Sequence, residues 1–167
     1  LPFIGLGQDS YEKSCWKITK KIDKFDDIIT YYSPLELPIS FTKVIDNEND
    51  NEKIYLGIKV IGHTANAFIK GVKVLLDNGK KLSWPNEEID SKVNNNSKFE
   101  YSAFVTLNKQ EIAILKEHYI TDVRLYIYDK EIESPLQYRD YLMCIDENKS
   151  KEGYEKPEIE ETESDYD

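Results

Sequence analysis

The stretch IYLGIKVI, residues 54–61, decides the fold class of this chain. Its apolar side chains recur at every second position, as Ile54, Leu56, Ile58 and Val60. Successive side chains of a β-strand point to opposite faces, so a period of two is typical of a strand with one face against a core. The stretch therefore predicts a long strand in a sheet that is covered on one side.

Other segments of the chain carry the same pattern or are rich in β-branched and aromatic residues. They are residues 16–20, 28–32, 39–44, 71–76, 81–84, 99–107 and 120–129. Asn78-Gly79 separates two of them and predicts a hairpin with a type I′ turn, because this dipeptide supplies two residues with positive φ.

Two helices are predicted in the second half of the chain. Asn108 followed by Glu111 has the form of a capping box and predicts a short helix between two strands. Ser134-Pro135 places an N-cap residue before a proline and opens a helix through about Ile145. About eight short strands without strand–helix–strand alternation indicate an antiparallel β-sandwich with one inter-strand helix and a C-terminal helix.

The N-terminus has the character of a processed leader. The segment LPFIGLG, residues 1–7, is apolar and ends in small residues at Gly5 and Gly7. Signal peptides end in this way, so we predict residues 1–7 to be a signal-peptide remnant with cleavage before Gln8. A mobile apolar terminus or a first strand is the alternative. Export would place the protein in the periplasm or outside the cell.

The C-terminus differs from the rest in composition. Residues 149–167 contain eight acids and three lysines, with few apolar side chains to offset the entropy of ordering. We predict a disordered acidic tail there, or alternatively an acidic docking peptide. Residues 8–148 then form the sandwich domain.

Charge and composition exclude several classes of protein. The chain has 167 residues and a formal net charge of −10, which argues against a nucleic-acid binder, because phosphate contacts need clustered Lys and Arg. No apolar run approaches the roughly 20 residues of a membrane span.

The two cysteines, Cys15 and Cys144, lie near the two ends of the predicted domain. An oxidising compartment would permit a disulfide between them. Two separate buried thiols are the alternative, since a free cysteine packs as a small apolar side chain.

The chain also resembles small uncharacterised exported proteins of Bacteroidetes-type bacteria. The matching pieces are Trp16, Lys21–Asp27, Tyr31–Ser33, Gly71–Gly79, Leu107–Ile112 and Ile120–Leu125, together with the N-terminal ending. The resemblance implies an exported protein of this fold and no particular activity.

Motifs for common chemistries are absent from the sequence. It has no glycine-rich phosphate loop and no Gly-x-Ser-x-Gly elbow, and no cofactor is predicted. His63 and His118 have no second His or Cys at ligand spacing, so no metal site is predicted from them. We interpret His63 as a solvated turn residue and His118 as a charge at the end of the short helix.

One loop is rich in oxygen ligands. Residues 46–52, Asp46 to Glu52, read DNENDNE, and calcium takes six to eight such oxygens. The loop lacks the glycine with which an EF-hand turns. A polar loop between two strands is the alternative interpretation.

Aromatic residues are the remaining resource for binding. The predicted binding residues are Trp84, Tyr31, Tyr101, Tyr126 and Tyr128, all on or beside predicted strands. Rings offer a large contact area on stiff side chains. Cross-strand packing is the alternative role for these rings.

These observations favour a non-catalytic exported binding module whose partner is a protein or a glycan. The first alternative is an acidic inhibitor or immunity-type protein that masks a basic enzyme surface. The second is a hydrolase with a carboxylate pair, drawn from adjacent acids such as Asp26-Asp27 or Glu87-Glu88.

Overall fold

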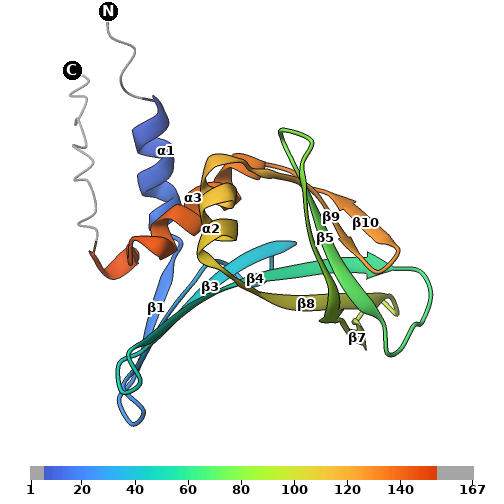
Figure 1. Ribbon diagram of the computed structural model, residues 1–167, viewed down its shortest axis with the longest axis horizontal. Helices are drawn as coiled ribbons and strands as arrows, with labels where there is room; N and C mark the ends of the chain where they lie inside the picture. Colours follow the sequence, from blue (N-terminus) through green and yellow to red (C-terminus); the bar gives the residue numbers. More distant parts are fainter. Residues whose placement is uncertain (1–5, 154–167) are drawn as a thin grey trace, which may run out of the picture.

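Two antiparallel sheets and three α-helices make up the part of the chain that the structure describes, residues 6–153 of a computed structural model (Figure 1). The larger sheet has the order β1 (Thr19–Asp23), β2 (Ile28–Tyr32), β3 (Ile39–Asp46), β4 (Asn51–Gly62), β8 (Phe99–Leu107), β7 (Asp90–Val93). The smaller has the order β10 (Tyr128–Glu131), β9 (Ile120–Leu125), β5 (Lys70–Leu76), β6 (Lys81–Glu88). The predicted mainly β, antiparallel, sandwich-like fold is confirmed.

Strand β4 lies at the centre of the larger sheet, between β3 and β8. Its alternating residues Ile54, Leu56, Ile58 and Val60 are all buried, as the pattern predicts. The apolar face continues in the neighbouring strands, since Leu56 lies opposite the buried residues Phe41 of β3 and Val105 of β8. The inner face of this sheet is therefore the floor of the core.

Two different layers cover that floor. The four-stranded sheet lies over β4 and β8, whereas α3 (Pro135–Asp146) packs on β3 (Figure 1). Helices α1 (Leu6–Cys15) and α2 (Lys109–Glu117) pack in turn against α3. One half of the molecule is thus a sandwich of two sheets and the other half is a sheet covered by helices.

A buried lysine joins the helical layer to the sheet. Lys43 of β3 is only 2% exposed, and its Nζ donates to the carbonyl oxygen of Asp146 at 3.0 Å. Its charge is balanced by Glu52 Oε1 at 2.6 Å. The last carbonyls of a helix have no partner within the helix and carry the negative end of its dipole, so a cation there stabilises the end of α3.

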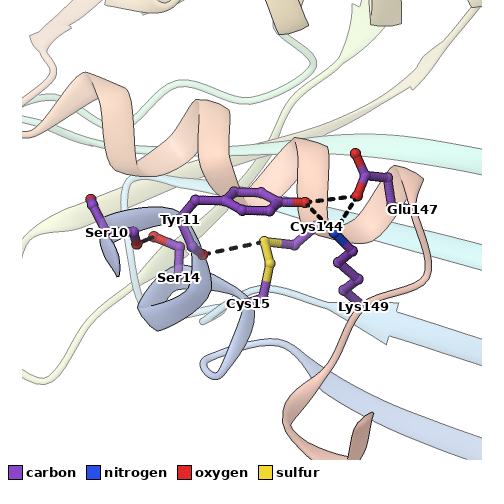
Figure 2. Close-up of a disulfide and its surroundings, with 7 residues drawn as sticks. All are labelled: Ser10, Tyr11, Ser14, Cys15, Cys144, Glu147 and Lys149. Atoms are coloured by element: carbon purple, nitrogen blue, oxygen red, sulfur yellow. Dashed lines mark hydrogen bonds and ion pairs between the residues drawn. A yellow bond between two sulfur atoms is a disulfide. The ribbon is translucent and has the colours of Figure 1, made fainter. Parts of the chain in front are cut away.

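Cys15 at the end of α1 and Cys144 in α3 form a disulfide, with 5.3 Å between their Cα atoms (Figure 2). Both sulfurs are buried in the core cluster. The bond closes a loop with a sequence separation of 129 residues and ties the N-terminal helix to the C-terminal one. Of the two interpretations that the sequence leaves open, the structure therefore has the disulfide.

A small polar cluster lies beside the disulfide (Figure 2). The Tyr11 hydroxyl donates to Glu147 Oε2 at 2.9 Å, and Lys149 Nζ lies 2.6 Å from that carboxylate. Burial and the Glu147 hydrogen bond raise the pKa of Tyr11 to about 12. The same contacts lower the pKa of Glu147, with Lys149 as the first cause. These pairs hold the start of the C-terminal segment against α1.

The folded body extends further than predicted at its C-terminus. Ser150 is buried, and the Lys151 N–H donates to the carbonyl oxygen of Ile18 at 3.1 Å, just before the short 3-10 helix η1 (Lys151–Gly153). Residues 149–153 therefore belong to the body and not to the predicted tail, because these backbone bonds fix them to it. The remainder of that tail lies outside the described residues.

The predicted remnant, residues 1–7, lies mostly outside the described residues as well. Helix α1 begins at Leu6, so the predicted cleavage point before Gln8 falls in its first turn. The sequence pattern did not indicate this helix. No helix among residues 6–153 has the length and apolar character that a membrane crossing requires.

Two predicted turns differ in detail from the structure. The Asn78-Gly79 hairpin is confirmed between β5 and β6, but only Gly79 has a positive φ, at +79°. The Gly79 N–H donates to Leu76 O, which makes a type I turn followed by a glycine bulge instead of type I′. The predicted strand 120–129 is a hairpin, with Leu125 opposite Tyr128 and the chain reversing at Tyr126 and Ile127.

The two predicted helix starts also differ. Asn108 and Glu111 form the predicted capping box, with side chain to backbone bonds of 2.8 Å in both directions. Ser134, in contrast, has a left-handed backbone at φ 54° and makes no side-chain cap bond. Pro135 alone sets the start of α3, because its fixed φ suits the first helical position.

The disulfide predicts a large effect of reduction on stability. In the chain-entropy model, opening a loop of this length lowers the free energy of unfolding by about 5 kcal/mol. Urea denaturation of the protein with and without reductant, and of a Cys15→Ala/Cys144→Ala variant, measures this loss. Detection of two free thiols in the unreduced, denatured protein would contradict the bond.

Lys43 gives a second prediction. Lys43→Met leaves the Asp146 carbonyl without its donor, so we expect a loss of about 1–3 kcal/mol in the free energy of unfolding. The matched control is Lys53→Met on the exposed end of β4, for which we expect a change within about 0.5 kcal/mol. Equal effects of the two substitutions on the urea midpoint would show that the buried contact contributes nothing.

Candidate functional site

Exposed apolar side chains gather at one end of the sandwich, which we call the loop end. Of the ten large apolar side chains that are exposed in the described residues, five lie there. They are Ile61, Phe68, Val93, Tyr126 and Ile127. The end of β4 lies beside the start of β8 and the end of β7, since Gly62 is opposite Phe99 and Phe99 is opposite Val93. Tyr126 joins them from the other sheet, because its ring contacts that of Tyr128, which stacks on Tyr101 of β8.

The two bulky residues with a left-handed backbone lie at the same end. Seven non-glycine residues in the described part have a positive φ, and five of them are Asp, Asn or Ser. The two bulky ones are Phe68, at 58°, and Tyr126, at 57°. Short polar residues tolerate this region, whereas a bulky residue there is uncommon and costs energy that the surrounding structure must supply. Phe68 is moreover fully exposed, so burial of its own ring does not supply that energy.

Two stacked tyrosines hold the loop that carries Phe68. The rings of Tyr101 in β8 and Tyr128 in β10 lie 4.7 Å apart with an interplanar angle of 16°. Asn66 donates from its backbone N–H to the Tyr101 hydroxyl at 3.0 Å, and from Nδ2 to the Tyr128 hydroxyl at 2.6 Å. Both hydroxyls also donate to the carbonyl oxygen of Thr64. Loop 63–69 is thus bonded to one strand of each sheet.

The two hydroxyls differ in acidity because their surroundings differ. Burial raises the pKa of Tyr101, whose side chain is enclosed in the core. The hydrogen bond with the Thr64 side chain lowers the pKa of Tyr128.

Gly62, the last residue of β4, makes room for this stack. A Cβ atom there would lie 2.5 Å from Tyr101 Cε2 and 2.8 Å from Tyr128 Cζ. Real Cβ atoms do not approach other heavy atoms so closely, so any side chain at this position would displace both rings. The glycine serves close approach, since its φ is not positive.

The structure brings together three of the five predicted binding residues, and only one of them has an exposed ring. Tyr101, Tyr126 and Tyr128 meet at the loop end, where Tyr126 packs edge-on to Tyr128 at 6.5 Å between centroids. Tyr101 is buried, and Tyr126 is exposed. Tyr31 is buried elsewhere, in β2. Packing therefore takes Tyr31 and Tyr101, whereas Tyr126 stays exposed, and a binding role for these residues stays a prediction.

Trp84 also has a structural role. Its Nε1 donates to Glu111 Oε1 at 3.0 Å, while Glu111 Oε2 accepts from the Asn108 N–H and caps α2. One carboxylate thus connects β6 to the start of α2. The indole is partly buried and packs against the core.

Sequence reasoning missed Phe68, the most exposed ring at the loop end. The segment HTANAF, residues 63–68, has no strand or helix period and contains no chemical motif. The available signal was a lone aromatic residue in a loop of small and polar residues. Thr64 and Asn66 carry no sign of their role either, because their partners are more than 30 residues away.

The predicted calcium loop bonds to itself. Asn49 donates from its backbone and side-chain nitrogens to the two carboxylate oxygens of Asp46, at 3.1 and 2.7 Å, and lowers the pKa of that carboxyl. Glu52 pairs with Lys43. Within residues 6–153, no three His, Cys, Asp or Glu side chains are grouped as metal ligands. The geometry favours the polar-loop interpretation.

The two histidines lie in different settings. His118 ends α2, and its Nδ1 lies 3.0 Å from Asp77 Oδ1, so the helix-end interpretation gains a carboxylate partner. His63 is exposed in the loop that carries Phe68.

A groove of about 260 Å³ lies between β4 and β10. Three carboxylates are among its lining residues, which bears on the hydrolase alternative: Glu36, Glu100 and Asp129. Arg124 pairs with Asp129 and lowers the pKa of its carboxyl, and Lys92 lies 3.1 Å from Glu100. A carboxylate-pair hydrolase needs one carboxyl that keeps its proton near neutral pH. The ion pair of Asp129 opposes that role.

Comparisons of the chain with protein-family models, curated proteins and solved structures found no match. The function proposed for the loop end therefore rests on the geometry described above.

The tyrosine stack is testable through Gly62. We expect Gly62→Ala to separate the rings and to lower the free energy of unfolding by about 1–3 kcal/mol, as overpacking does in cores. Loss of the tyrosine signal in near-UV circular dichroism would accompany it. Tyr128→Phe keeps the ring and serves as the control that retains the stack. A Gly62→Ala protein with unchanged stability and spectrum would contradict the packing described here.

Proposed function

We propose that this chain is a non-catalytic binding module that acts in the periplasm or outside the cell and contacts a protein partner with its loop end. The observation that carries the proposal is Phe68, whose ring is fully exposed on a backbone held in the left-handed region. Strain of this kind persists where the surrounding structure imposes it, and it clusters at functional sites. An exposed apolar patch of several side chains is in turn a common mark of a protein interaction site.

The hydrogen bonds beneath the patch support this role. Binding costs free energy for each side chain and loop that must be ordered, so a loop that is already bonded to the body loses less. Thr64 and Asn66, four and two residues before Phe68, tie the loop to Tyr101 and Tyr128. Aromatic anchors on such preorganised supports are typical of the residues that dominate interface energetics.

The disulfide supports the proposed compartment. A bond between Cys15 and Cys144 forms and persists in oxidising surroundings, which the periplasm and the cell exterior provide. The predicted signal-peptide remnant points the same way. Location remains part of the proposal.

A specific feature favours the acidic inhibitor as the second candidate. The β1–β2 and β3–β4 turns lie together at the other end of the molecule and form an acidic tip (Figure 1). Seven carboxylates belong to these two turns and their flanks: Asp23, Asp26, Asp27, Asp46, Glu48, Asp50 and Glu52. Asn47 bonds to Asp27 and joins the turns, and Phe25 at the tip is 96% exposed. Such a tip would steer the protein onto a basic surface.

Site-specific photo-crosslinking separates the two candidates. A photoreactive phenylalanine analogue replaces Phe68 in one variant and Phe25 in a matched variant, since both rings are exposed and lie at opposite ends. In cells that export the protein, we expect a discrete crosslinked product from position 68 and none from position 25. Crosslinks from position 25 alone, weakened by added salt, would favour the acidic tip and contradict the proposal. Absence of a crosslink from both positions would contradict both candidates.

A further inference from the structure

Strand β4 continues past the end of its neighbour β3. The last paired residues are Ile58 of β4 and Ile39 of β3, and β4 runs on to Gly62. One more bond follows, from the Lys59 N–H to the carbonyl oxygen of Pro38 at 2.8 Å. Pro38 has no N–H to return that bond. Beyond this point the chain before β3 leaves the sheet, so one edge of β4 has no neighbouring strand.

The alternation of an antiparallel ladder identifies the backbone groups on this free edge. Lys59 faces the β3 side, so Ile61, two residues on, faces the same side, whereas Val60 and Gly62 face β8. Pro38 occupies the place opposite Lys59, so the free groups that a further strand can reach are the N–H and the carbonyl of Ile61. Within residues 6–153 no hydrogen-bond partner occurs for these two groups. They form the hydrogen-bonding pattern of a strand that lacks its neighbour.

A groove runs along this free edge. Its lining comes from β4, from the segment before β3, from Glu100 of β8 and from β10: Glu36, Pro38, Lys59, Val60, Ile61, Glu100, Asp129 and Lys130. Strand β10 is itself the edge of the smaller sheet and forms the opposite wall. Lys59 Nζ donates to Leu35 O at 2.7 Å, which holds the segment before β3 in place beside the groove.

We propose that this groove binds an extended peptide segment of a protein partner, which adds to β4 as a short strand in line with β3. The free groups are one donor and one acceptor on the same residue, Ile61, and one residue of an extended main chain presents the complementary pair. An apolar side chain of the segment would pack on Ile61, which is partly exposed. Glu36 and Lys130, which form no ion pair in the described residues, would select charged residues at its flanks.

This inference concerns a different mode of contact from the proposed role of the loop end, although Ile61 belongs to both surfaces. Strand addition draws its affinity from main-chain hydrogen bonds, and contact through Phe68 draws it from burial of apolar side chains. A Phe68→Ser variant would therefore lose binding through the loop end and keep the addition of a peptide strand to β4.

The experiment uses a random twelve-residue peptide library displayed on phage, with the disulfide-bonded protein as the target. The selected peptides are synthesised, and their affinities are measured for the wild type and for Ile61→Pro. Proline removes the free N–H of Ile61 and costs no bond of the β4–β8 ladder, because that group faces away from β8. We expect at least about a tenfold loss of affinity with Ile61→Pro. Ile61→Val keeps both the N–H and an apolar β-branched side chain and is the matched control, with affinity within about threefold of the wild type.

A second measurement decides the matter if Ile61→Pro fails to fold. The selected peptide is N-methylated at one position at a time, and binding to the wild type should fall only at the position that pairs with β4, with its alternate neighbours unaffected. Failure of the library to yield a binder, equal binding to wild type and Ile61→Pro, or tolerance of methylation at every position would overturn the proposal. Binding that Phe68→Ser abolishes would assign the peptide to the loop end instead.

Discussion

The apolar inner face of β3, β4 and β8 must be removed from water, and the smaller sheet covers only part of it. Strands β4 and β8 are covered by the second sheet, and β3 is covered by α3 (Figure 1). A helix packed on a sheet needs partners for its terminal carbonyls, which the sheet cannot offer from its own backbone. Lys43 of β3 donates a hydrogen bond to the carbonyl oxygen of Asp146 at the end of α3, and the disulfide fixes α3 to α1. The larger sheet is therefore covered by two different layers, a second sheet over one half and helices over the other.

The division also separates the main stabilising contacts from the proposed binding surface. The disulfide, the Tyr11 cluster and Lys43 all lie in the half covered by helices. The loop end lies in the half formed by two sheets, where strands terminate and loops converge. Connections at the end of a sandwich can vary without disturbing the core, because the ladders behind them carry the packing. Loop 63–69 thus lies at a distance from the disulfide and Lys43, which stabilise the other half of the molecule.

Both proposed contacts arise where a regular pattern stops. Phe68 and Tyr126 lie in connections between strands and have left-handed backbone conformations. Ile61 lies where β4 extends beyond the end of β3. A sheet interior satisfies its own hydrogen bonds and buries its own apolar faces, so little is left there for a partner to contact. Unpaired backbone and exposed rings remain only at edges and ends. The two surfaces therefore share an origin although they offer different chemistry.

The sequence by itself determined the fold class, most strands and the α2 capping box, because these depend on neighbours two to four residues apart. Ile54 to Val60 and the pair Asn108 and Glu111 are such cases. The β9–β10 turn escaped prediction, since Tyr126 and Ile127 continue the apolar pattern and contain none of the usual turn residues. Only the tertiary structure decided that Cys15 meets Cys144, that Tyr101 and Tyr128 pack as a stack, and that Phe68 stays exposed. Each of these depends on segments far apart in the chain, whose approach is set by the packing of two sheets and α3 and leaves no local pattern to read.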